Sequence, residues 1–177
     1  MYYKKLVGKQ VYLSPMDLKN EVEIMTKWMN EDEDIAHFNG FYDSLMGEEK
    51  VEALLTKWNE GPYLFSIVHK ETDTFMGHVS LFNADSHQQY ITLGIYVAKE
   101  YRHQGYGKEA MQLVIDFMFN TQRYHAIHIE VFSYNTHALE VYKKLGFKEC
   151  GRWHKARYHM GESHDVILME LFREDCK

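Results

Sequence analysis

Cysteine and proline are scarce, with two of each in the 177 residues of the chain. Cys150 and Cys176 form neither a C-x-x-C motif nor part of a metal-like cluster, so the sequence indicates no zinc site and no dense disulfide framework. A reduced compartment fits this usage, although a disulfide between the two stays open. With 15% aromatic residues and 11 glycines, the chain is neither collagen-like, nor of low complexity, nor disordered.

A long apolar run and an excess of positive charge are also missing. No segment approaches the ~18 apolar residues of a membrane-spanning helix, and the first residues lack the apolar core of a signal peptide. Twenty Lys and Arg against 26 Asp and Glu give a net charge of −6, which argues against a general binder of nucleic acids or anionic membranes. We therefore expect a soluble, cytoplasmic protein with no membrane or nucleic-acid partner. His125 and His128 would lie on opposite faces of a strand, and we expect no metal site.

The length suits a single domain over residues 1–177, and apolar residues recur at strand and helix spacings. These spacings predict strands at residues 9–13, 63–70, 75–83, 89–97, 125–132, 147–154 and 164–172, and helices at residues 17–30, 48–59, 105–121 and 135–145. Because strands 89–97 and 125–132 flank one helix, they should form a parallel crossover in an otherwise antiparallel sheet. This arrangement is typical of a mixed α+β protein.

The loop between strand 89–97 and helix 105–121 carries the first chemical signal. Two glycines at a helix start leave backbone N–H groups uncovered, and the helix dipole adds positive potential there, which suits a diphosphate. Arg102 and Lys108 would add mobile positive charge. A solvated loop with a glycine-eased helix start is the alternative. The candidate binding residues are Arg102, His103, Gln104, Gly105, Tyr106, Gly107 and Lys108.

Three phosphate-binding motifs compete for this loop. A P-loop requires Ser or Thr after its Gly-Lys pair, where this chain has Glu109. The dinucleotide fingerprint matches Gly105, Gly107 and Ala110, but its first glycine should directly follow a strand, and here a polar stretch intervenes. The third motif, R-x-x-G-x-G, is matched by Arg102, Gly105 and Gly107.

With this third motif the sequence resembles the GNAT superfamily of acyl-CoA N-acyltransferases. Residues 135–147 match a second family motif, since they read N-T-H-A-L-E-V-Y-K-K-L-G-F. The resemblance implies the GNAT fold, a mostly antiparallel sheet of about six or seven strands with a central parallel β-α-β crossover and about four helices. Residues 11–17, 28–30, 151–152 and 161–165 are similar to the branch that contains ribosomal-protein N-terminal, polyamine and some antibiotic-modifying acetyltransferases.

The resemblance also implies how the co-substrate acetyl-CoA binds. The R-x-x-G-x-G loop wraps its pyrophosphate. A bulge at Gly94 splays the strand from its parallel neighbour, so that the pantetheine arm pairs with the backbone of Ile95, Tyr96 and Val97 as an added strand would.

The second motif places two polar groups on one helix face. Asn135 and Tyr142 are seven residues apart, about 700° of helix, and therefore lie within ~20° of each other, with Ala138 between them. Such a face could follow the pantetheine arm, with Asn135 and Ala138 as cofactor contacts, and the resemblance makes Tyr142 the donor to the coenzyme A sulfur. The alternative is that Asn135 only caps the helix and Tyr142 is only a core aromatic.

The general base is not evident. Many relatives carry a Glu two residues before the bulge glycine, where this chain has Thr92, which cannot accept a proton. His78, Asp85 and His87 lie in the neighbouring strand and turn and are candidate replacements.

We expect transfer of an acetyl group from acetyl-CoA to a primary amine, such as a polyamine, an aminoglycoside or a protein N-terminus. The acids at residues 31–34 favour a cationic acceptor, with a solvated helix end as the alternative. His37, Phe38 and Tyr42 suggest an aromatic acceptor pocket. An acyl-CoA sensor without turnover, a dinucleotide-dependent oxidoreductase and a homodimer stay open.

Overall fold

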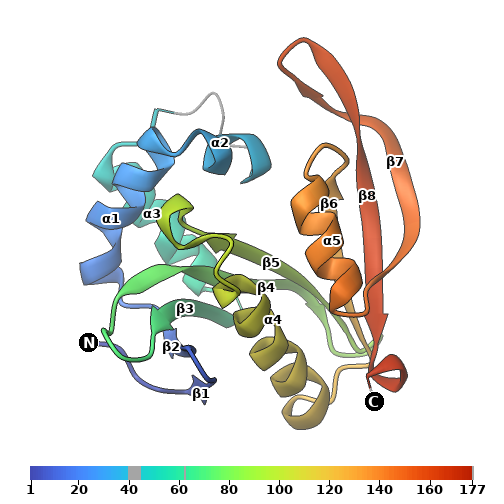
Figure 1. Ribbon diagram of the computed structural model, residues 1–177, viewed down its shortest axis with the longest axis horizontal. Coiled ribbons are helices and arrows are strands. Elements are labelled where there is room, and N and C mark those ends of the chain that lie inside the picture. The colour runs from blue at the N-terminus through green and yellow to red at the C-terminus, as the bar shows by residue number, and fades with distance from the viewer. Residues whose placement is uncertain (40–44, 62, 177) are drawn as a thin grey trace. The chain divides into compact units, whose positions relative to one another are not determined.

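The computed structural model describes residues 1–39, 45–61 and 63–176, which contain eight strands and five α-helices (Figure 1). The strands are β1 (Leu6–Val7), β2 (Val11–Pro15), β3 (Tyr63–His69), β4 (Phe75–Asp85), β5 (Tyr90–Val97), β6 (Ala126–Phe132), β7 (Lys148–His159) and β8 (Glu162–Phe172). The helices are α1 (Leu18–Glu31), α2 (Glu33–Asn39), α3 (Glu48–Asn59), α4 (Tyr106–Asp116) and α5 (Thr136–Lys144).

The strands form one sheet in the order β1-β2-β3-β4-β5-β6-β8-β7. β5 and β6 run parallel, whereas β1–β2, β2–β3, β3–β4, β6–β8 and β7–β8 are antiparallel. The parallel pairing of β5 and β6 follows from the α4 crossover. The predicted mixed class with a parallel crossover is confirmed.

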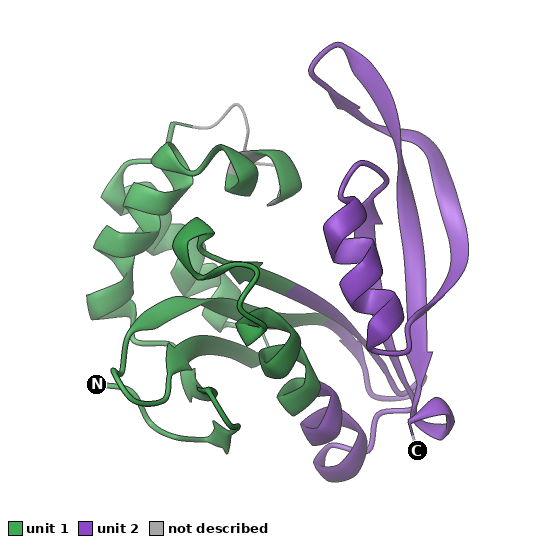
Figure 2. Ribbon diagram, in the orientation of Figure 1, with its two compact units in different colours: residues 1–82, 95–114 green, residues 83–94, 115–177 purple. Residues whose placement is uncertain are grey.

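The chain divides into two compact units (Figure 2). Residues Met1–Phe82 and Ile95–Val114 form the first unit, and residues Asn83–Gly94 and Ile115–Lys177 form the second. The chain passes from one unit to the other inside β4, β5 and α4, so that each of these elements contributes residues to both.

The core of the first unit contains α1 and α3. In α1, Trp28 and Met29 follow Met25 by three and four residues, and all three are buried. They belong to one cluster with Val51 and Leu55 of α3. Val51 and Leu55 are 0% exposed, and burying each contributes ~1.5–3 kcal/mol. The apolar stripe of each helix is therefore what holds it in the unit.

In the second unit, β6 pairs with β8 along its whole length. Ile127, Ile129 and Val131 are buried, whereas His128 and Glu130 between them are more exposed. This period of two is the strand pattern read from the sequence. β7 is the last strand of the order and is mostly exposed.

The structure contains two elements that the sequence analysis missed. One is the two-residue β1, and the other is α2, which follows α1 after Asp32. The Asp32 side chain accepts the Asp34 N–H at 3.1 Å at the start of α2, and Glu33 and Asp34 favour the positive end of the helix dipole. The sequence predicts that these acids attract a cationic acceptor or lie at a solvated helix end, whereas in the structure Glu33 and Asp34 begin a helix.

Two predicted boundaries also differ. The helix predicted at residues 105–121 ends as α4 at Asp116 and continues as a π-helical turn, Phe117–Thr121. The strand predicted to end at residue 154 continues to His159, through a register shift between Trp153 and Arg157. The shift interrupts the alternation, which hides the second half of β7 from a pattern of period two.

Over residues 1–39, 45–61 and 63–176, no helix combines the length and apolar character needed to cross a membrane. The same residues contain no group of three or more His, Cys, Asp or Glu side chains that could hold a metal ion. Cys150 and Cys176 are both exposed and free. The suggested acceptor residue Tyr42 lies outside the described residues.

Candidate active site

The predicted cofactor loop belongs to the first unit and joins β5 to α4. A 3₁₀ turn at Lys99–Tyr101 precedes His103 and Gly105, whose φ angles of 61° and 87° are left-handed. α4 then begins at Tyr106, and the Glu109 N–H donates to the Gly105 carbonyl at 3.0 Å. The amides of the first helical turn have no acceptor within the helix and are suited to an anion.

The two glycines of the motif serve different purposes. A Cβ on Gly105 would find only the Gln10 Nε2 at 4.0 Å, so that the space is open and the left-handed φ is what favours glycine. A Cβ on Gly107 would lie 3.2 Å from Val97 Cγ2 and 3.6 Å from Ile95 Cδ1. Gly107 therefore allows α4 to approach β5 closely, whereas Gly105 allows the turn before it.

The Arg102 side chain is held by three acceptors of the first unit. Its Nε donates to the Val97 carbonyl at 2.8 Å, its Nη1 to Asp34 at 2.6 Å and its Nη2 to Asp32 at 2.7 Å. Asp32 is 6% exposed. Arg102 is therefore not the mobile cation that we expected, because two carboxylates already offset its charge and fix it in place.

This clamp ties the cofactor loop to the junction of α1 and α2. The Asp32 N–H caps α1 by donating to the Trp28 carbonyl at 2.8 Å, and the Trp28 indole donates to the Glu100 carboxylate at 3.2 Å. Two of the four acids at residues 31–34 are thus occupied by Arg102. The electrostatic argument for a cationic acceptor is correspondingly weaker.

The remaining loop residues differ in their surroundings. The Tyr106 ring lies edge-on to His69, with 5.6 Å between ring centroids, and the Gln104 amide donates to the Glu100 carbonyl at 3.0 Å. Lys108 is exposed in the first turn of α4, where a cation would add to the helix dipole in attracting an anion.

Glu109 is a structural anchor that the sequence analysis did not single out. Its carboxylate accepts the Gln10 N–H at 2.9 Å, the Val11 N–H at 3.4 Å and the Gln10 side-chain amide at 3.3 Å. Burial alone would raise the pKa of Glu109, but these hydrogen bonds outweigh it and the pKa is lowered. The glutamate that rules out a P-loop thus fastens α4 to the start of β2.

The β5 segment predicted to pair with pantetheine, Ile95, Tyr96 and Val97, lies in the first unit. Ile95 and Val97 are the residues under Gly107 of α4. Tyr96 packs edge-on against Trp28, with 5.8 Å between ring centroids. Its hydroxyl is buried with no hydrogen-bond partner in the described part of the chain, and burial, followed by the charge of Asp32, raises the pKa of Tyr96.

The second motif lies in the second unit, on α5. Asn135 is the N-cap, and its Oδ1 accepts the Ala138 N–H at 3.2 Å. This is the capping geometry that we gave as the alternative for Asn135. The amide nitrogen of the Asn135 side chain is not used by this cap. β5 pairs with β6 from Tyr90↔Ala126 to Thr92↔His128, so the parallel ladder precedes Gly94, the expected bulge.

Tyr142 is almost fully buried on α5, 9% exposed, with its ring centroid 6.1 Å from that of Phe147. Burial raises the pKa of Tyr142 to about 12. The phenol is therefore protonated at neutral pH and can act as a hydrogen-bond donor. This is the state that the role of donor to a thiolate requires.

Of the three candidate bases, Asp85 is poorly suited. The Asp85 carboxylate accepts the N–H groups of Gln88 and His87, each at 2.8 Å, and these bonds lower the pKa of Asp85. A carboxylate stabilised in this way is a weaker base. His87 is exposed in the same turn, and Thr92 is buried, 5% exposed.

His78 lies instead in a buried polar network of the first unit. Its Nε2 is 2.6 Å from the Glu21 carboxylate, which also accepts the Ser66 hydroxyl at 2.6 Å and the Asp17 N–H at 2.9 Å. Facing a carboxylate, Nε2 carries the proton, which leaves Nδ1 as the acceptor. In the described residues Nδ1 is buried without a partner.

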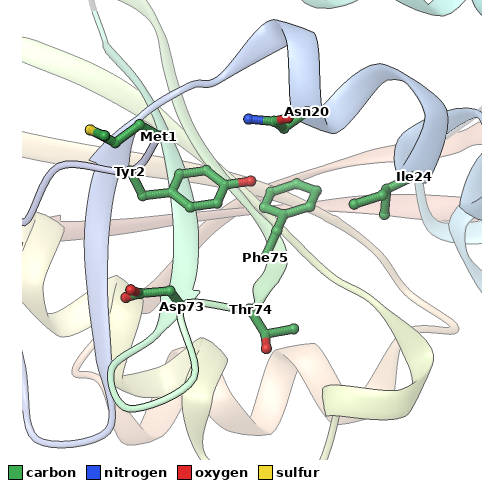
Figure 3. Close-up of a pocket in the computed structure, with 7 residues that line it drawn as sticks. All are labelled: Met1, Tyr2, Asn20, Ile24, Asp73, Thr74 and Phe75. Atoms are coloured by element: carbon green, nitrogen blue, oxygen red, sulfur yellow. The ribbon is translucent and has the colours of Figure 1, made fainter.

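The same unit contains an open pocket of about 570 Å³ (Figure 3). The Tyr2 and Phe75 rings stack in it with 6.4 Å between centroids, and Asn20 and Ile24 of α1 also line it. Burial, then the charge of Glu21 and a hydrogen bond to it, raise the pKa of Tyr2. The pocket contains none of the predicted site residues.

Comparison with known families gives a match over most of the chain. Residues 10–148 match the model of the acetyltransferase (GNAT) domain. The chain belongs to the GNAT acetyltransferase family. The GNAT domain includes R-x-x-G-x-G and residues 135–147, so the predicted resemblance is confirmed.

Individual relatives and solved structures that the chain resembles also carry acetyltransferase names. The chain is 29% identical over 114 residues, which span 63% of each protein, to the SPbeta prophage-derived uncharacterized N-acetyltransferase YokL of Bacillus subtilis. A GNAT-family acetyltransferase structure from Bacillus anthracis superposes with a TM-score of 0.82 at 18% identity, over 98% of this chain and 99% of that one. Spermidine N-acetyltransferase from Vibrio cholerae, solved in complex with CoA and spermine, has a TM-score of 0.82 at 18% identity, over 95% and 98%.

Proposed function

We propose that this GNAT protein transfers the acetyl group of acetyl-CoA to a primary amine by direct attack. The observation that carries the proposal is the left-handed turn at Gly105 followed by the start of α4, inside a GNAT domain. An anion of the size of a pyrophosphate suits the amides there. The dinucleotide alternative is not favoured, because the same glycines belong to the acetyltransferase domain.

The proposed cofactor contacts are assigned for each unit separately. In the first unit, the backbone amides of His103–Lys108 bind the pyrophosphate, Arg102 holds the loop that presents them, and the backbone of Ile95, Tyr96 and Val97 pairs with pantetheine. In the second unit, we assign Asn135 and Ala138 as candidate contacts of pantetheine. The family domain extends over both units, which supports one catalytic domain.

The chemical step needs three groups. An alkyl amine with a pKa of ~10.4 must lose a proton before it attacks the thioester, and backbone donors must stabilise the tetrahedral oxyanion. The departing thiolate, of pKa ~8.5, then gains from a hydrogen-bond donor. Tyr142, which burial keeps protonated, supplies that donor in the proposed mechanism.

For the proton acceptor, His78 is the most suitable of the three candidates. Glu21 fixes its tautomer and leaves Nδ1 without a partner, which is how an oriented base is held. The amine proton would pass through water to Nδ1. The Asp85 carboxylate is occupied by two backbone N–H groups of its turn.

Purified protein should release free thiol from acetyl-CoA when a polyamine, an aminoglycoside, an amino acid or an N-terminal peptide is supplied. The Vibrio cholerae enzyme solved with spermine makes polyamines the first acceptors to assay. Binding of acetyl-CoA without thiol release for any acceptor would leave the acyl-CoA sensor. Absence of binding would contradict the proposal. We further propose a cytoplasmic location, since the substrates are soluble, and a homodimer stays open.

A further inference from the structure

The second unit contains an arginine whose charge is not balanced by any carboxylate in the described residues. Arg157 lies near the end of β7, and its guanidinium carbon is 5.0 Å from the centroid of the Phe132 ring. Its Nε is buried, and no residue within 1–39, 45–61 or 63–176 accepts a hydrogen bond from it. Asp165, which follows the paired residue His164 on β8, accepts the Lys155 N–H at 3.0 Å and is paired with Arg152 at 3.6 Å.

Contact with Phe132 does not satisfy this group. A cation–π contact uses the face of the guanidinium plane, whereas the N–H donors point outward in the plane. A buried donor without an acceptor costs free energy, and such a group in a native structure calls for an unseen partner. In a chain of net charge −6, an arginine that lacks an acidic partner is conspicuous.

The surroundings of Arg157 are rich in aromatic rings. His164 lies opposite Arg157 in the β7–β8 ladder. The Tyr134 ring is 4.7 Å from His164, edge-on, and 5.4 Å from His159, stacked. Tyr134 immediately precedes Asn135, the cap of α5. The cluster of Phe132, Tyr134, Arg157, His159 and His164 thus lies where β6 leads into the helix of the second GNAT motif.

We propose that this cluster, which we call the Arg157 site, binds an anionic oxygen group, a carboxylate or a phosphate, through the guanidinium of Arg157. Arginine presents parallel N–H donors that match the two oxygens of such a group. The group can come from the amine acceptor, as the carboxylate of an amino acid or peptide, or from a phosphate of the coenzyme. Anion binding by Arg157 does not depend on the proposed acetyl transfer. Only the assignment of the anion to the acceptor or to the coenzyme rests on the proposed function.

Binding can be measured without turnover. Histidine imidazole resonances of the full chain are followed by NMR while sodium succinate, and separately inorganic phosphate, is added at constant ionic strength. We expect the His164 signals to shift in the wild type, and the apparent affinity to fall about tenfold or more in Arg157→Gln. Arg152→Gln is the matched control, because it removes a charge from the same strand at an arginine already paired with Glu149 and Asp165.

The source is then distinguished by two comparisons. If the group belongs to the acceptor, Arg157→Gln lowers the ratio of kcat/KM for an amino acid to that for its decarboxylated amine about tenfold. If it belongs to the coenzyme, calorimetry shows that Arg157→Gln weakens coenzyme A about tenfold more than it weakens 3′-dephospho-coenzyme A.

Arg157→Lys, which keeps the charge, should retain more of the anion binding than Arg157→Gln and so separates charge from loss of fold. Equal succinate and phosphate affinities in the wild type, Arg157→Gln and Arg152→Gln would overturn the proposal, whatever the acetylation assay shows.

Discussion

Arg102 of the first unit and Arg157 of the second have opposite environments. Arg102 belongs to the family motif and donates to two carboxylates and a carbonyl. Arg157 belongs to no motif, and its buried Nε has no partner in the described chain. The arginine that the motif nominates for a ligand is already satisfied by protein, whereas the one outside it is not. The partners of each donor therefore distinguish an arginine held by protein from one that is not, and motif membership does not.

The largest effect is expected on kcat at Tyr142, and it distinguishes a catalytic role of the hydroxyl from packing of the ring. Tyr142→Phe keeps the buried ring and removes only the hydroxyl, so kcat should fall about 10²-fold, with little change in acetyl-CoA affinity. Because the pKa of Tyr142 is about 12, its ionisation should not limit the wild-type rate up to about pH 10. Thiol-release kinetics over this pH range check both points, and equal kcat values would remove Tyr142 from the mechanism.

Breaking the Arg102 clamp should mainly cost stability. Truncating one partner of a buried ion pair costs about 3–5 kcal/mol, but the Arg102 side chain is 21% exposed, so we expect Arg102→Gln to lower the free energy of unfolding by about 2 kcal/mol. Urea denaturation measures this. Adding Asp32→Asn should recover part of the loss, since it removes the stranded charge. Fully additive losses would mean that the two side chains do not interact.

The His78 network gives a smaller, kinetic effect. His78→Gln removes the acceptor Nδ1 while keeping a polar group near Glu21, and we expect kcat to fall about tenfold with little change in the KM for acetyl-CoA. Ser66→Ala touches the same carboxylate without touching the base and is the matched control. If the two variants lose the same activity, His78 is part of the fold and not of the reaction.

Glu109 should make stability depend on acid pH. Its folded pKa lies below the ordinary value of 4.5, so its contribution is complete above about pH 4.5 and is lost as the pH falls through the lower, folded pKa. Glu109→Gln should therefore cost up to about 1 kcal/mol at pH 7 and less at pH 3.5. Urea midpoints at the two pH values measure the stability that Glu109→Gln loses. A larger loss at pH 3.5 than at pH 7 would contradict the prediction.

The smallest effect on stability is expected at Arg157. Because its Nε has no protein partner to strand, Arg157→Gln should change the free energy of unfolding by about 0.5 kcal/mol or less. The same urea titration as for Arg102→Gln gives the direct comparison. A loss as large as that of Arg102→Gln would show that Arg157 is structural.

Local pattern predicted much of the fold. The bounds of α3 and the cap of α5 by Asn135 follow from apolar spacing and capping chemistry over a few residues. The partners of Arg102 do not, because Asp32 is 70 positions away in the chain. α2 was missed because acids that begin a helix look like acids on a surface, and the end of β7 was missed because its register shift breaks the alternation.

In the candidate site too, local patterns were predictable from the sequence and contacts between distant residues were not. Gly105 and Gly107 were found from spacing, but their different reasons, a left-handed φ and a close approach to Val97, are visible only in three dimensions. Glu109 entered the sequence analysis only as a mismatch to a P-loop. Its role depends on Gln10 and Val11, which lie 99 and 98 positions away. No local signal indicates such a contact.

Titration of coenzyme A into the 177-residue protein, followed by ¹H–¹⁵N NMR, shows whether the backbone of the loop binds the pyrophosphate. We expect the backbone amide signals of Gly105, Gly107 and Lys108 to shift, while the Arg102 Nε–H, already donating to the Val97 carbonyl, does not shift. A large shift of the Arg102 Nε–H with unmoved loop amides would contradict it, because the motif arginine would then bind the pyrophosphate in place of the backbone.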